Sequence, residues 1–124
     1  MVKKQVGIWM DHSFAFIMTL ENKKVVENIV ELEIPHLETD YDSGNNEKLK
    51  DNKSQQFQLN YYRKLIDCIK NYQDVILFGP TDAKNELLNL LKTEHFFKNI
   101  HIEIQDSDKM TTMQMHEFVT SYFK

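Results

Sequence analysis

The sequence is poor in the residues that mark several classes of protein. It contains one cysteine, three glycines and two prolines among its 124 residues. A single cysteine, Cys68, excludes an internal disulfide and a cysteine-based metal cluster. The scarcity of glycine and proline argues against a fibrous or low-complexity chain. We therefore expect one globular domain over residues 1–124, because a chain of this length can bury a real core.

Basic residues are also too scattered for a protein that binds nucleic acid by itself. The net charge is −4, and Arg63 is the one arginine. Proteins that bind duplex phosphates with high affinity usually carry a basic stripe, because the release of counterions drives that binding. The composition therefore argues against autonomous duplex binding, whereas a local basic contact within a larger assembly stays open.

Long apolar runs are absent too. None approaches the roughly 20 residues that a membrane-spanning helix needs. The N-terminus lacks the apolar core of a secretory signal peptide. We expect a cytoplasmic protein without a membrane partner.

The first part of the chain predicts three strands. Residues 5–10 form a nearly continuous apolar run, which is typical of a central strand buried on both faces. Residues 14–20 and 24–34 follow after short polar turns, so the three segments predict an antiparallel meander. In the third strand, the inward face is expected to carry alternate apolar residues (Val26, Val30, Leu32 and Ile34).

Helices and strands alternate in the remainder of the chain. The expected elements are a helix from an N-cap at Ser54 to about Tyr72, a strand over 74–78, a helix beginning near Thr81, an edge strand over 100–105 and a last helix from about Thr111. The buried stripe of the first helix is expected to hold Phe57, Tyr61, Leu65, Cys68 and Tyr72. Ahead of that helix, the polar residues 36–53 predict a long flexible loop.

This β-β-β-α-β-α-β-α order determines a topology. Right-handed crossovers through helices make the first, fourth and fifth strands parallel. The chain is therefore predicted to be an α/β protein with a ribonuclease-H-like mixed sheet of five strands. The predicted strand order is 3-2-1-4-5, with the second strand antiparallel and helices on both faces.

Ligands of open α/β sheets bind beyond the carboxyl ends of the strands, where the strand order reverses. Here that point lies between the first and fourth strands. The residues expected there are Asp11, His12, Gly79, Pro80, Thr81 and Lys84, with Asp108 and Lys109 following the fifth strand. Amides at a helix start together with Lys84 predict an anion or partner crevice. In the alternative interpretation, Lys84 pairs with Asp11 and only stabilises the turn.

Two segments resemble a known family. The first strand ends at Asp11 and is followed directly by a second strand, and residues 75–84 read Val-Ile-Leu-Phe-Gly-Pro-Thr-Asp-Ala-Lys. Both features resemble the middle domain of archaeal and eukaryotic peptide-chain release factors and of Pelota. The resemblance covers essentially the whole chain. It implies a stand-alone bacterial relative of that domain, with the ribosome or tRNA as partner.

The departure from the family concerns the loop before the first helix. In release factors this loop carries Gly-Gly-Gln, which positions water against the peptidyl-tRNA ester. Here the loop contains Ser43-Gly44-Asn45-Asn46, and the sequence has no Gly-Gly-Gln. The resemblance therefore implies a binding module without hydrolytic activity, as in Pelota-type domains.

No catalytic residue, metal ligand or cofactor is predicted, because the five histidines show no ligand spacing. Two rival interpretations stay open. The first is a metal-dependent nuclease or other hydrolase of the ribonuclease-H-like fold, in which Asp11, Asp82 and either Asp106 or Asp108 hold divalent ions. The second is a structural homo-oligomer that pairs through the exposed edge strand.

Overall fold

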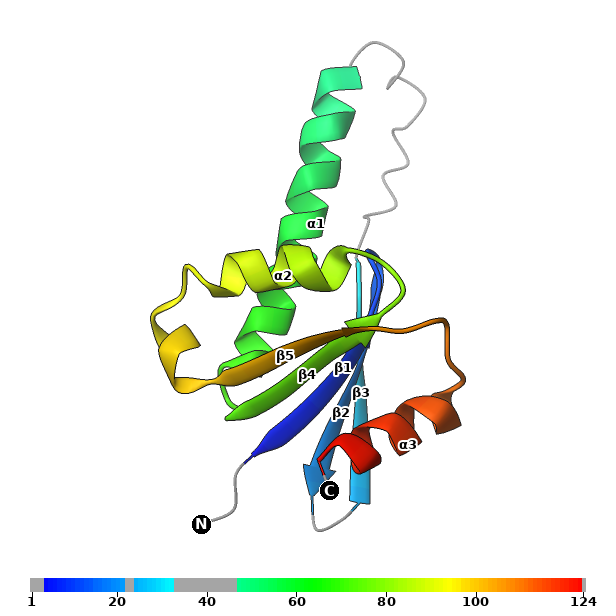
Figure 1. The fold of residues 1–124 in the computed structure, drawn as a ribbon. Coiled ribbons are helices and arrows are strands. Elements are labelled where there is room, and N and C mark those ends of the chain that lie inside the picture. The colour runs from blue at the N-terminus through cyan, green and yellow to red at the C-terminus, as the bar shows by residue number, and fades with distance from the viewer. Residues whose placement is uncertain (1–3, 22–23, 33–46, 124) are drawn as a thin grey trace.

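The sheet predicted from the sequence is present in the computed structural model, which describes residues 4–21, 24–32 and 47–123, with the main chain alone for 21 and 47–54. The elements are β1 (Gln5–Met10), β2 (Phe14–Glu21), β3 (Lys24–Glu31), α1 (Glu47–Ile69), β4 (Asp74–Gly79), α2 (Ala83–Leu91), the short 3-10 helix η2 (His95–Asn99), β5 (His101–Asp106) and α3 (Thr112–Tyr122). The strand order is β3-β2-β1-β4-β5, with β2 antiparallel to both neighbours and β4 parallel to β1 and β5. The predicted fold class is confirmed (Figure 1).

The core lies on both faces of the sheet. Along β4, Val75 and Leu77 belong to a cluster covered by α1 and α2, whereas Ile76 and Phe78 belong to a cluster covered by α3 (Figure 1). Side chains of a strand alternate between the two faces, so a strand with helices on both sides must be apolar throughout. This explains the continuous apolar runs of β1 and β4.

The edge strands are less well covered. Ile102 and Ile104 of β5 are partly buried against the α1–α2 cluster, as the alternating pattern predicts. In β3, Val30 packs against the same cluster, but Val26 is 43% exposed. Val26 and Val30 lie on the same face of β3, as expected, but that face is not buried along its whole length. Ile34 lies outside the described residues.

Helix α1 begins earlier than expected. It starts at Glu47 rather than at a cap on Ser54, and it ends at Ile69 rather than near Tyr72. Residues 47–53 are therefore helical and do not belong to a loop, and the first part of α1 projects beyond the sheet (Figure 1). The rest of the predicted loop, residues 36–46, lies outside the described residues.

Helix α3 begins as expected. Thr111 is its N-cap and forms a reciprocal capping box with Gln114. Met115 is buried, whereas Met113 is 71% exposed.

The start of α2 differs from expectation in one detail. The sequence predicts that the helix begins near Thr81, but its N-cap is Asp82 and its first residue is Ala83. The hydroxyl of Thr81 nevertheless accepts a hydrogen bond from the Ala83 amide at 3.2 Å.

Candidate functional site

The carboxyl ends of β1 and β4 lie side by side. Trp9 pairs with Phe78 in parallel register, so the chain leaves the sheet at the same end after Met10 and after Gly79. Gly79 has a φ of 151°, and a Cβ atom at this position would overlap with the Met10 carbonyl oxygen. Glycine therefore allows the two chain exits to approach each other closely.

Asp11 is committed to the β1–β2 turn. Its carboxylate accepts hydrogen bonds from the amides of Ser13 at 2.9 Å and Phe14 at 2.8 Å. Its carbonyl oxygen accepts a hydrogen bond from the Tyr61 hydroxyl of α1 at 2.9 Å. Asp11 thus holds the turn and joins it to α1, which is a structural role.

Lys84 is only 1% exposed, and it points toward the fifth strand rather than toward the first. Its ammonium group donates to the Thr81 carbonyl oxygen at 2.6 Å and contacts the Asp106 carboxylate at 2.8 Å. The expected pairing of Lys84 with Asp11 is therefore wrong. Lys84 pairs instead with Asp106, which lies directly beside Gly79 in the β4–β5 register.

A polar network that the sequence did not reveal connects the β1–β2 turn to both nearby helices. Glu86 of α2 accepts from the Tyr62 hydroxyl of α1 at 2.5 Å and contacts the His12 ring at 3.2 Å. Gln58 of α1 donates to the His12 carbonyl oxygen at 2.8 Å. Tyr62 is 3% exposed, whereas the side chains of His12 and Glu86 are 44% and 49% exposed. The network is thus buried at Tyr62, whereas the side chains of His12 and Glu86 are accessible to a partner.

The network changes the acidity of its members. The hydrogen bond from Tyr62 has the largest effect on the pKa of Glu86, and together with the contacts with His12 it lowers this pKa against the opposing effect of burial. Burial and the bond to Glu86 raise the pKa of Tyr62. Glu86 is therefore an anion at neutral pH, and it stabilises the fold above the carboxyl pKa of the unfolded chain. That contribution is lost as the pH falls through the lowered pKa of the folded state.

Replacing Tyr62 with phenylalanine should therefore weaken the protein in a pH-dependent way. We expect a loss of about 1 kcal/mol in the free energy of unfolding at neutral pH, because a hydrogen bond to a half-exposed carboxylate disappears. The loss should shrink once acid protonates Glu86. Urea unfolding of both proteins at neutral and acidic pH measures this difference, and an equal loss at both would contradict it.

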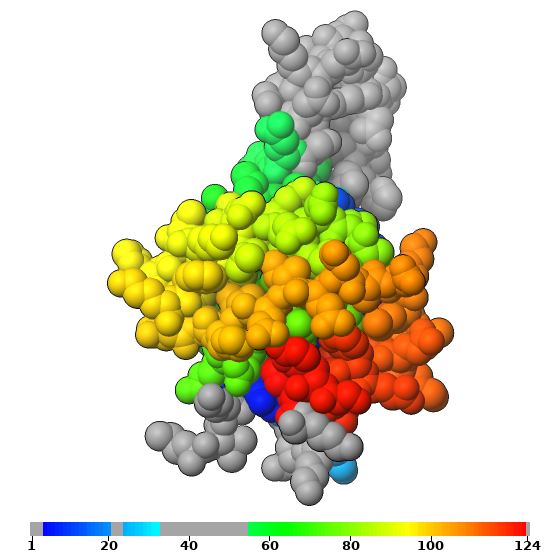
Figure 2. All heavy atoms as spheres, in the orientation of Figure 1, coloured from blue at the N-terminus to red at the C-terminus, as the bar shows by residue number. Residues whose placement is uncertain are grey.

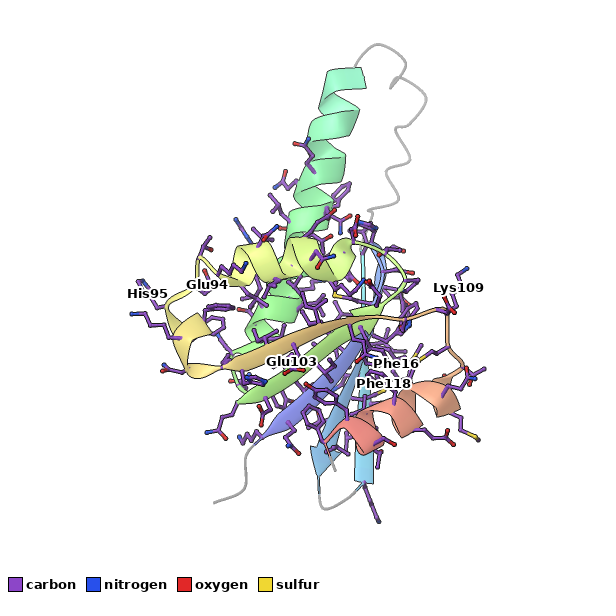
Figure 3. The ribbon with its side chains drawn as sticks, viewed as in Figure 1. Phe16, Glu94, His95, Glu103, Lys109 and Phe118 are labelled. Atoms are coloured by element: carbon purple, nitrogen blue, oxygen red, sulfur yellow. The ribbon has the colours of Figure 1, made fainter. Side chains whose placement is uncertain are left out.

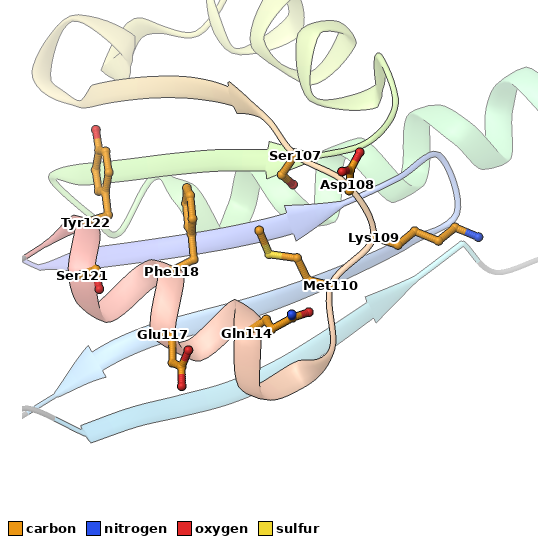
Figure 4. Close-up of a pocket in the computed structure, with 9 residues that line it drawn as sticks. All are labelled: Ser107, Asp108, Lys109, Met110, Gln114, Glu117, Phe118, Ser121 and Tyr122. Atoms are coloured by element: carbon orange, nitrogen blue, oxygen red, sulfur yellow. The ribbon is translucent and has the colours of Figure 1, made fainter.

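Two of the predicted site residues lie elsewhere. Asp108 and Lys109 line an open groove of about 820 Å³ along α3, together with Ser107, Met110, Gln114, Glu117, Phe118, Ser121 and Tyr122 (Figure 4). Lys109 projects from the connection between β5 and α3 (Figure 3). The predicted site residues are thus divided between the ends of β1 and β4 (Asp11, His12 and residues 79–84) and this groove.

Among the described residues, three other kinds of feature could indicate a function: a metal site, a nucleophilic thiol and a membrane-spanning helix. No group of three or more His, Cys, Asp or Glu side chains among them is arranged to hold a metal ion. Burial raises the pKa of the Cys68 thiol, which disfavours the nucleophilic thiolate. None of the described helices has both the length and the apolar character needed to cross a membrane.

Comparison with known proteins gives a match at the level of structure. No family model matches, and neither does any curated protein. Pelota from Archaeoglobus fulgidus aligns with a TM-score of 0.60 at 14% identity, over 96% of this chain and 31% of its own. Pelota from Thermoplasma acidophilum gives 0.59 at 14% identity, over 96% and 32%. The archaeal translation termination factor aRF1 gives 0.52 at 13% identity, over 97% and 39%. The chain has the fold of one part of Pelota and aRF1.

The resemblance predicted from residues 75–84 and the strand order is thereby confirmed as a shared fold. The Pelota-like fold accounts for nearly all of this chain, whereas the chain spans only about a third of the length of either Pelota.

Proposed function

We propose that this protein is a non-catalytic binding module of the translation machinery that contacts the ribosome or tRNA. The observation that supports this is the match of 96–97% of the chain to two Pelota proteins and a translation termination factor. Because one fold can serve many functions, this support is an analogy, and the chemistry of the site must agree with it.

The chemistry at the ends of β1 and β4 fits binding better than catalysis. Asp11 and Lys84, two of the charged groups there, already make contacts within the turn and with β5. The sequence contains no Gly-Gly-Gln with which to position a hydrolytic water. The proposed module therefore acts without a cofactor and without cleaving its partner.

The surface proposed to meet the partner is the exposed part of the region at the ends of β1 and β4. His12 and Glu86 present half-exposed polar groups, and Pro80, which follows Gly79 at the end of β4, is also exposed. Lys84 is excluded from direct contact because it is buried. Lys109, on the separate groove, supplies a matched exposed position for comparison.

Co-sedimentation of the purified chain with ribosomes from its native cytosol tests the proposal, with free tRNA binding measured in parallel. We expect recovery with one of these partners, a clear loss for His12→Ala and little change for Lys109→Ala. We also expect no hydrolysis of ribosome-bound peptidyl-tRNA. Absence of binding to both partners would contradict the proposed function, and saturable hydrolysis would contradict its non-catalytic character.

The nuclease interpretation gains no support from the geometry. Asp106 pairs with Lys84 and Asp11 closes a turn, so each carboxylate already has a structural role. An assay of RNA and DNA cleavage with magnesium, repeated with a chelator, tests this alternative directly.

A further inference from the structure

β5 forms an edge of the described sheet and lies at the surface between α2 and α3 (Figure 2). The amides of His101 and Ser107 bond to carbonyl oxygens of residues 73–79, at 2.8 Å and 3.1 Å. Backbone groups alternate in direction along a strand, so the N–H and C=O groups of Ile102 and Ile104 point away from β4. An outer row of backbone donors and acceptors of this kind is a template for a further strand.

The side chains of β5 give this edge a particular chemistry. Ile100, Ile102 and Ile104 are partly buried toward the α1–α2 cluster. On the opposite face, His101 and Glu103 stand two residues apart with side chains 63% and 51% exposed. When a strand pairs with an antiparallel copy of itself, an imidazole and a carboxylate at this spacing can lie opposite each other: the imidazole of one copy faces the carboxylate of the other.

Glu103 is held as an anion by its own chain. The Tyr122 hydroxyl of α3 donates to its carboxylate at 2.5 Å, and the His101 ring contacts the same group at 3.1 Å. The bond from Tyr122 and then that from His101 lower the pKa of Glu103. The same bond, after burial, raises the pKa of Tyr122 to about 12, so this hydroxyl remains a donor at physiological pH.

We propose that the protein forms a symmetric homodimer by antiparallel pairing of two β5 strands centred on Ile102. In this register Ile102 lies opposite its own copy, and the two residues exchange both backbone hydrogen bonds. Glu103 then lies opposite His101 of the second copy, and Ile104 lies opposite Ile100. The pairing repeats about the two-fold axis, as an isologous interface requires.

Charge complementarity favours a second copy of this chain as the partner of β5, and it favours one register of the two strands. Centring the pair on Glu103 would place two anionic carboxylates directly opposite each other, which is destabilising. Centring it on Ile104 would place Asp106 against Ile102 and leave Glu103 without an opposite charge. The Ile102 register alone gives two His–Glu pairs and keeps isoleucines together. The dimer does not depend on the function proposed above.

Sedimentation velocity of the full chain over a range of concentrations tests this pairing. His101→Glu and Glu103→Lys each remove the opposite-charge pair, so each should weaken dimerisation about tenfold or more. The double variant exchanges the charges and should restore it. A wild type that stays monomeric throughout, singles that dimerise normally or a double variant that fails to recover would each overturn the proposal.

Tyr122→Phe is the matched control. It removes the same hydrogen bond from Glu103 as Glu103→Lys does, but it keeps the carboxylate, so it should still form dimers. A loss equal to that of Glu103→Lys would show that the Tyr122 contact, and not the charge pair, matters, and would overturn the proposal.

Oxidative cross-linking separates the registers. In a Cys68→Ala background, Ile102→Cys should form a covalent dimer, because this residue meets its own copy at a distance that a disulfide can bridge. Ile104→Cys should form little. The reverse result would contradict the proposed register.

Discussion

Replacement of Gly79 by alanine should destabilise the protein by at least about 3 kcal/mol, a large part of the stability of a typical domain. The φ of 151° is one that residues with a side chain rarely adopt. The new methyl group would also overlap with the Met10 carbonyl oxygen, which belongs to the backbone of a central strand and cannot move alone. Relieving the overlap would separate β1 from β4 at the candidate site.

Gly7 provides the comparison. A Cβ atom at Gly7 would meet the Val119 side chain of α3 rather than a backbone atom. Helix α3 can shift to relieve this clash, so Gly7→Ala should cost less, within the roughly 1–3 kcal/mol typical of overpacking. Urea unfolding measures both variants. A Gly79→Ala protein as stable as Gly7→Ala would contradict the close approach of the two strand ends.

Removal of Asp106 is the second large effect that we expect. Asp106→Ala leaves the Lys84 ammonium, 1% exposed, without its carboxylate partner. Breaking a buried pair in this way costs about 3–5 kcal/mol, but Asp106 is itself 91% exposed and water can partly replace it. We therefore expect a loss of about 2 kcal/mol in the free energy of unfolding.

Lys84→Met should cost less than Asp106→Ala, about 1 kcal/mol at most, because it leaves no buried charge and the exposed carboxylate returns to water. The two variants thus distinguish a buried cation from an ordinary surface pair. Equal losses in chemical unfolding would contradict this asymmetry. If the ammonium only stabilises the turn, inorganic phosphate should not raise the Tm of the wild type relative to Lys84→Met.

Most of the fold was predictable because local patterns determine it. The apolar runs of β1 and β4 and the alternation in β5 reflect how many faces of each strand are covered. Right-handed crossovers then leave few strand orders open. The start of α1 was missed because the sequence offered an apparent cap at Ser54, and the polar residues before it continue the helix instead. Helix boundaries depend weakly on composition when the residues are polar but helix-compatible.

The polar contacts of the site were not predictable in the same way. Tyr62 was missed because the predicted buried stripe of α1 included Tyr61 and the residues at helical spacing from it. In the structure both tyrosines are buried, and their ring centroids are 5.5 Å apart. Nothing in the sequence around Glu86 distinguishes it from an exposed helical acid. Its pairing with Tyr62 depends on how α1 and α2 lie over the sheet.

The sequence by itself therefore determined the types and order of the elements, the strand order and the end of the sheet where chain exits converge. Tertiary structure alone decided that Lys84 pairs with Asp106 instead of Asp11, and that Asp108 and Lys109 line a different surface. The physical reason is the range of the interactions. Burial imposes a period of two or 3.6 on the apolar residues of a strand or helix, which can be read from neighbouring residues. The partner of a charged side chain instead depends on which distant segments of the chain the fold brings within a few ångströms of it.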